Sequence, residues 1–150
     1  MLASAVPGFV DALIDRFTTA FATSMVSVED GPPLNRQVVP GDVLSVGDQG
    51  PDGPAATSEV TRGLGLGIRR QETSEVFCTF TSTTGDAALA PRRAQCRWAV
   101  QQIDSALQAD PILGGAVDKC ELGSLTWQQE QHPAGVTCRV VFTVLGWKEG

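Results

Sequence analysis

Histidine is nearly absent from this chain, and the sequence patterns of the commonest catalytic and metal sites are missing. The only histidine is His132, and no GxSxG, HExxH or CxxC pattern occurs. Activated nucleophiles, general acids and zinc ions all depend on such groups held close to a helper residue. The sequence therefore predicts no catalytic residue, no metal site and no cofactor.

Basic residues are also scarce. The chain carries 11 Lys and Arg against 17 Asp and Glu, which gives a formal net charge of −6. A surface that grips nucleic-acid phosphates needs clustered Lys and Arg, so specific DNA binding is not expected. An acidic surface would let DNA pass close by without sticking, although it serves plain solubility equally well.

Long apolar runs are missing as well. No stretch approaches the ~20 apolar residues of a membrane-spanning helix. The first residues, MLASAVPGFVDALID, lack the basic region of a secretory signal and reach Pro7 and Gly8 before an apolar run develops. We therefore expect neither a membrane association nor export by the secretory route.

The four cysteines lie far apart and form no metal-binding pair. Cys78 and Cys138 alternate in phase with apolar strand residues, and Cys96 lies on the apolar stripe of a predicted helix. Small buried thiols are typical of a reducing compartment, whereas disulfides concentrate in small secreted domains. We expect all four thiols to be reduced and unliganded.

The stretch from Val136 to Trp147 shows a long, regular strand pattern, around which the rest of the predicted domain is organised. It alternates as one long strand, with an apolar face formed by Val136, Cys138, Val140, Phe142 and Val144. The opposite face begins polar and ends with Val141, Leu145 and Trp147. That face is too apolar for full exposure and too polar for a deep core, so we expect a partner to cover it.

Two helices and several strands complete the predicted domain. Apolar residues recur at spacings of three and four in two segments, which predicts helices from about Pro7 to Thr23 and from about Pro91 to Ala109. Alternating segments predict further strands at Ser24 to Glu29, Glu59 to Arg70, Thr73 to Ser82 and Leu122 to Gln129. We place a turn at Gln71-Glu72 and pair the Leu122 strand with the closing one.

The 150 residues fit a single domain, which at this length buries roughly 70% of the surface of the unfolded chain. The predicted fold class is α+β: a mostly antiparallel sheet, with an N-terminal helix and a long central helix packed on one face.

A long Pro/Gly-rich loop is predicted from about Gly31 to Pro54. Loops of this length tend to be functional, and the apolar group Val43, Leu44 and Val46 within it is a candidate interface. The alternative is that Asp42 to Val46 is a strand of the domain's own sheet. The basic pair Arg69-Arg70 is a further candidate, because such pairs form salt bridges across interfaces as well as lying in solvent.

Five phrases in order carry a family resemblance: VEDGPP, DVLSVGD, RRQETSEVFCTF, QADPILGG and VTCRVVFTVLGW. Together with the order of elements, they resemble the tail terminator proteins of long-tailed bacteriophages, of the lambda-type fold family and particularly those from phages of actinobacteria. The resemblance covers nearly the whole chain. It implies a six-fold ring of small α+β subunits that caps the tail tube and stops its polymerisation, with no catalytic activity.

The same resemblance implies the partners and the location. They are other copies of the chain, the tail tube protein and the head-side stopper or connector, at the tail-neck junction of a virion assembled in the host cytoplasm. DNA would pass through the channel without specific binding. Two alternatives stay open: another component of the phage neck, where stoppers are mainly β-barrels and adaptors mainly helical, and a small ligand-binding or enzymatic domain.

Overall fold

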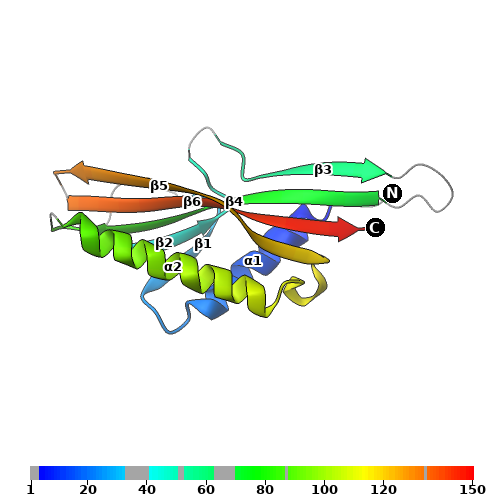
Figure 1. The fold of residues 1–150 in the computed structure, drawn as a ribbon, viewed down its shortest axis with the longest axis horizontal. Helices are drawn as coiled ribbons and strands as arrows, with labels where there is room; N and C mark the ends of the chain where they lie inside the picture. Colours follow the sequence, from blue (N-terminus) through cyan, green and yellow to red (C-terminus); the bar gives the residue numbers. More distant parts are fainter. Residues whose placement is uncertain (1–3, 33–40, 51–52, 63–69, 87, 134) are drawn as a thin grey trace.

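A computed structural model describes residues 4–32, 41–50, 53–62, 70–86, 88–133 and 135–150. Its helices are α1 (Val6–Ala20), α2 (Leu89–Ala109) and the short 3-10 helix η1 (Leu113–Gly115). Its strands are β1 (Val26–Asp30), β2 (Gly41–Val46), β3 (Ala56–Arg62), β4 (Arg70–Thr84), β5 (Lys119–His132) and β6 (Gly135–Glu149). All strands belong to one sheet (Figure 1).

Two long central strands organise the sheet. β4 and β6 are each 15 residues long and pair antiparallel from Gln71 opposite Glu149 to Thr84 opposite Val136. The strand order is β1-β2-β4-β6-β5, with β1 parallel to β2 and the other pairs antiparallel. The expectation of a mostly antiparallel sheet is therefore confirmed, and so is the pairing of β5 with the closing strand.

Strands β2 and β3 share one edge of β4. β2 pairs with its C-terminal half, where Leu44 lies opposite Phe80, and β3 pairs with its N-terminal half. Between the two, the chain leaves the sheet at Gly47 and returns at Ala55, and both residues hydrogen bond to the backbone of Phe77. Gly47 has a φ of 84°, a left-handed conformation that glycine adopts without steric cost.

Both helices cover the same face of the sheet, as Figure 1 shows. The residues that the helices bury recur at spacings of three and four, because these positions share one side of a helix. They are Phe9, Leu13 and Phe17 of α1 and Cys96, Ala99, Ile103, Ala106 and Leu107 of α2. They pack against apolar residues of β2, β4 and β6, which confirms the α+β fold class.

Two sequence predictions about this sheet are wrong. Residues Gly31 to Pro54 are not one long loop, because Gly41–Val46 forms strand β2 between β1 and β4, which confirms the alternative of a strand at Asp42 to Val46. Leu44 and Val46 point to the helix-covered face and have no exposed surface. The predicted turn at Gln71-Glu72 is wrong as well, since both residues pair within β4.

Candidate assembly interface

The face of the sheet opposite α1 and α2, here called the helix-free face, is the first candidate site. The strand register places Val141, Leu145 and Trp147 of β6 on this face, together with Phe77 of β4 and Val43 of β2. All five side chains are half-buried. The structure thus brings four of the predicted interface residues to one surface. It adds Phe77, which the alternation of its strand also assigns to this face but which is not among the predicted interface residues.

Threonines fill the floor of the helix-free face. Thr79, Thr83, Thr137 and Thr143 are all less than 10% exposed, with values of 7, 5, 2 and 4%. The hydroxyls of Thr83 and Thr137 lie 3.0 Å apart and hydrogen bond across β4 and β6. Because these threonine side chains are short and two of their hydroxyls hydrogen bond to each other, the larger apolar side chains extend beyond them into solvent.

One end of the helix-free face is polar. The Arg139 guanidinium donates to Glu130 Oε1 at 3.1 Å and lies 3.4 Å from Gln128 Oε1, both on β5. His132 Nε2 lies 3.0 Å from the Thr137 hydroxyl. These contacts hold Arg139, Glu130 and Thr137 within the domain, whereas the buried His132 Nδ1 has no hydrogen-bond partner among the described residues, and an exposed ion pair of this kind adds little stability.

The other end combines apolar and charged side chains. Leu145 and Trp147 lie there, and the Lys119 ammonium lies 5.4 Å from the centre of the Trp147 ring, close enough to be attracted to the ring face. The register sets Glu75 of β4 and Glu121 of β5 opposite Leu145, on the same face. The apolar surface at this end is therefore bordered by charged side chains on both neighbouring strands.

The other predicted interface residues behave differently. Leu44 and Val46 are part of the core and offer no surface to a partner, so their assignment to an interface is wrong. Arg70 begins β4, where its carbonyl accepts a hydrogen bond from Gly150 and its charge acts on Glu72. Arg69 lies outside the described residues.

Sequence patterns missed a second surface, on the other side of β5. Leu125 and Trp127 face the same side as Phe142 and Val140, yet they are 39% and 45% exposed. They lie on the edge strand of the sheet, where the helices do not cover them fully. Alternation predicts which face a strand residue takes, but not whether a helix reaches far enough to cover it.

A polar cluster beneath α2 was also missed. Arg92 donates to the Ser82 hydroxyl at 2.9 Å, Ser82 donates to Asp42 Oδ1 at 2.6 Å, and Gln95 donates to Asp42 Oδ2 at 2.8 Å. The cluster ties α2 to β4 and β2. Arg92 thus has a structural role within the fold.

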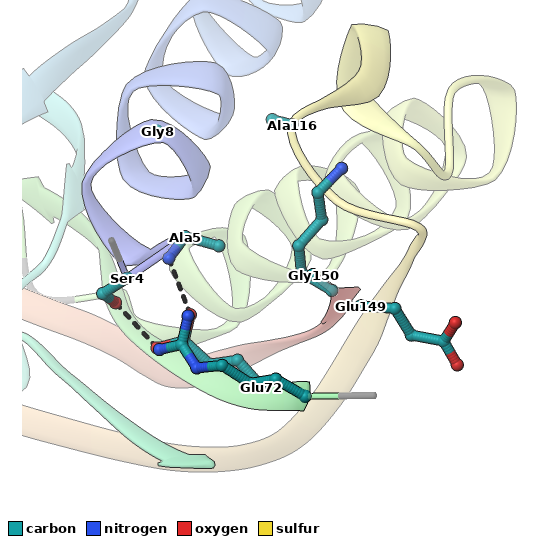
Figure 2. Close-up of a pocket in the computed structure, with 9 residues that line it drawn as sticks. Ser4, Ala5, Gly8, Glu72, Ala116, Glu149 and Gly150 are labelled. Atoms are coloured by element: carbon teal, nitrogen blue, oxygen red, sulfur yellow. Dashed lines mark hydrogen bonds between the residues drawn. The ribbon is translucent and has the colours of Figure 1, made fainter. Parts of the chain in front are cut away.

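A small cavity of about 280 Å³ lies at the start of α1, between that helix and the ends of β4 and β6 (Figure 2). Glu72 of β4 reaches its wall and accepts hydrogen bonds from the Ala5 N–H at 2.6 Å and the Ser4 hydroxyl at 2.7 Å. Burial acts to raise the pKa of Glu72, but these hydrogen bonds and nearby Arg70 hold it below its usual value. Glu72 thus anchors the first turn of α1, which lacks a capping side chain of its own.

The chemistry of the remaining groups is that of a folded core. All four cysteines are free and buried, and burial raises the pKa of Cys78 to about 12 and of Cys120 to about 11. Thiols with such pKa values carry almost no thiolate at neutral pH. Within the described ranges, no group of three or more His, Cys, Asp or Glu residues could hold a metal ion, and no helix there is long and apolar enough to span a membrane.

The geometry defines a class: an α+β domain with a two-layer body, one sheet face that the helices do not cover and apolar side chains at a sheet edge. A comparison of the chain with models of known protein families finds no match, and a comparison with curated proteins finds none either.

Proposed function

We propose that this protein is a structural subunit of a bacteriophage virion that assembles into a ring on the tail tube. In this proposal the ring, with the six copies that the resemblance implies, stops tube polymerisation and joins the tail to the head-side connector. It acts at the tail-neck junction, without catalysis, metal or cofactor. Its net charge of −6 favours free passage of DNA through the channel.

The observation that carries the proposal is the helix-free face. Phe77, Val141, Leu145 and Trp147 keep part of their apolar surface open, among the threonines of β4 and β6 and the carboxylates of Glu75 and Glu121. Apolar patches of this kind, when contiguous, mark protein-binding surfaces more often than plain solvent boundaries. The ordered phrases and the mixed α+β architecture support a tail terminator over a β-barrel stopper or a helical adaptor, the alternatives within the phage neck.

Substitution on the helix-free face tests the proposal. We expect Leu145→Glu to leave the monomer folded, because the side chain is only half-buried and repulsion from Glu75 and Glu121 opposite it costs about 1 kcal/mol or less for each pair. The variant should weaken ring formation or binding to the tail tube protein by tenfold or more. Native mass spectrometry measures how many copies assemble, and cosedimentation with assembled tubes measures binding to the tail tube. Circular dichroism checks the fold.

Gln101→Glu is the matched control, since it adds the same charge on the exposed side of α2. It should leave both readouts unchanged. A wild-type protein that stays monomeric at high concentration and does not bind tail tubes would exclude the proposed function. An unchanged Leu145→Glu variant would exclude the helix-free face as the surface used.

A further inference from the structure

Within the described part of the chain, the outer edges of β1, β3 and β5 have no strand beside them. β1 and β5 are the two ends of the strand order, on opposite sides of the sheet. β5 is 14 residues long, with one bulge between Leu122 and Leu125. An unpaired edge presents a row of free backbone N–H and C=O groups, which is a template for pairing with another strand.

The β5 edge carries an apolar patch with basic neighbours. Leu125 and Trp127 are 39% and 45% exposed on the helix side. Arg93 of α2 donates to Gln129 of β5 at 2.8 Å, which fixes the side of α2 that faces this edge. Arg97 and the half-buried Val100 follow Arg93 by one and two turns, so they lie along the same side of the helix.

The β1 edge has the complementary character. Val26 and Val28 of β1 are half-buried on the helix side, and Met25 just before them is 94% exposed. The strand ends in Glu29 and Asp30. Both edges therefore offer two neighbouring apolar residues of one strand on the helix side.

The helices beside the two edges differ in charge. α1 packs against β1, and its Asp11 and Asp15 are exposed on the side of the helix away from the buried Phe9 and Leu13. The basic side chain of α1, Arg16, turns toward α2 and donates to the Ala106 carbonyl at 3.0 Å. The helix beside β5 thus presents Arg93 and Arg97, and the helix beside β1 presents acidic side chains, while β5 itself also carries the exposed Glu121 and Glu130.

Strand direction fits a second copy. β1 runs parallel to β2, and each later neighbour in the order reverses direction, so β1 and β5 run in opposite directions. A neighbouring copy rotated about an axis along the strands keeps its strand directions and its helix side. Its β1 would then meet β5 antiparallel, with the apolar residues of both strands on the same face.

We infer that the outer edge of β5 in one copy pairs antiparallel with the outer edge of β1 in the next, so that the sheet continues from subunit to subunit. The register that joins the apolar residues sets Val26 opposite Trp127 and Val28 opposite Leu125. The contact uses two different surfaces, so repetition closes a ring or extends a filament. The inference rests on the proposed function, because it assumes that the assembly is a ring. Under this inference the helix-free face remains available to bind the tail tube.

Cysteine cross-linking tests this register. It sets Ser27 opposite Thr126, and both residues are exposed, so that Ser27→Cys and Thr126→Cys should fold normally. Directly opposite residues of an antiparallel pair have Cα atoms about 4.5–5.5 Å apart, within the range of a disulfide. Because the four native cysteines are buried, the introduced thiols are the reactive ones.

We expect an oxidised mixture of the two single variants to give a covalent dimer, and each variant alone to give at least tenfold less. The double variant should give a ladder of covalent oligomers that ends at the ring size. Thr61→Cys on the exposed strand β3 is the control, and mixed with Thr126→Cys it should give no dimer. Unchanged thermal melting of each variant confirms that it folds.

The outcomes separate this inference from the proposed function. A ring in native mass spectrometry without the Ser27–Thr126 cross-link overturns the edge pairing and leaves the tail function standing. Efficient cross-linking of Thr126→Cys with itself overturns it too, because that product requires two β5 edges to meet. The expected ladder without binding to tail tubes supports the edge pairing and excludes the tail function.

Discussion

At the scale of single residues, side chains distant in sequence carry out roles that local patterns do not show. Gly146 of β6 faces α1, and a Cβ there would lie 2.5 Å from the Phe9 ring. The glycine lets the helix approach the sheet closely. Glu72 acts in a similar way, since it supplies from β4 the hydrogen-bond acceptors that the start of α1 lacks.

Glu72→Gln tests this anchoring role. The variant keeps the shape of the side chain but removes its charge. We expect the free energy of unfolding at pH 7 to fall by about 1–2 kcal/mol, because hydrogen bonds to a charged group are the stronger kind. Chemical denaturation across a pH series measures the change, and Glu59→Gln, on exposed β3, serves as the control.

The sign of the pH dependence follows from the lowered pKa of Glu72. A carboxyl group with a lowered pKa in the folded state stabilises the fold above its unfolded value, near 4.5, and this stabilisation is lost as the pH falls through the folded pKa. The difference between wild type and Glu72→Gln should therefore be full at neutral pH and shrink in acid. A difference that stays constant into strong acid would contradict the charge-based role.

At the scale of secondary-structure elements, the sequence predicts the long, strongly periodic segments outright, whereas it predicts β2 only as an alternative to a long loop. α1, α2, β4 and β6 each have enough turns or alternations for their buried side to be recognised. β2 has six residues between prolines and glycines, too few for the pattern to show that it is a central strand. Tertiary pairing with β1 and β4 decides that, and pairing across the chain cannot be read from spacing.

The candidate site was predicted in the same uneven way. Val141, Leu145 and Trp147 were identified because the two-sided character of β6 lies within one strand. Leu125 and Trp127 were read as ordinary strand residues. Their exposure depends on where α2 crosses the sheet, which is set by contacts between elements far apart in the chain.

Leu44→Ala tests the corrected role of β2. Leu44 has no exposed surface, so its truncation should lower the free energy of unfolding by about 2–5 kcal/mol. Urea denaturation followed by circular dichroism measures the loss. Val43→Ala, one residue away on the helix-free face, should cost clearly less because that side chain is only half-buried. Equally small decreases in the free energy of unfolding in both variants would mean that Leu44 is a surface residue and not part of the core.

At the scale of the whole molecule, the apolar interior is continuous. One cluster of buried residues joins both helices to β2, β4, β5 and β6, and it includes all four cysteines. Cys78, Cys96, Cys120 and Cys138 come from four different elements. A single core of this kind predicts one cooperative unit, as expected for a single domain of this length.

Thiol reactivity tests that unity. Because the cysteines are at most 4% exposed, and burial also raises the pKa of Cys78, Cys96 and Cys120, an aromatic disulfide reagent should reach them only when the structure opens. We expect Cys78, Cys96 and Cys138 to react together, in one phase whose rate at low denaturant follows the global unfolding equilibrium. Cys120 lies on the edge strand β5 and has the greatest exposure of the four, so the Cys120→Ala variant isolates the central three. Separate phases for those three thiols would mean that the elements unfold independently. A core divided in this way could not hold the edges of β1 and β5 in the fixed geometry that the inferred edge-to-edge pairing requires.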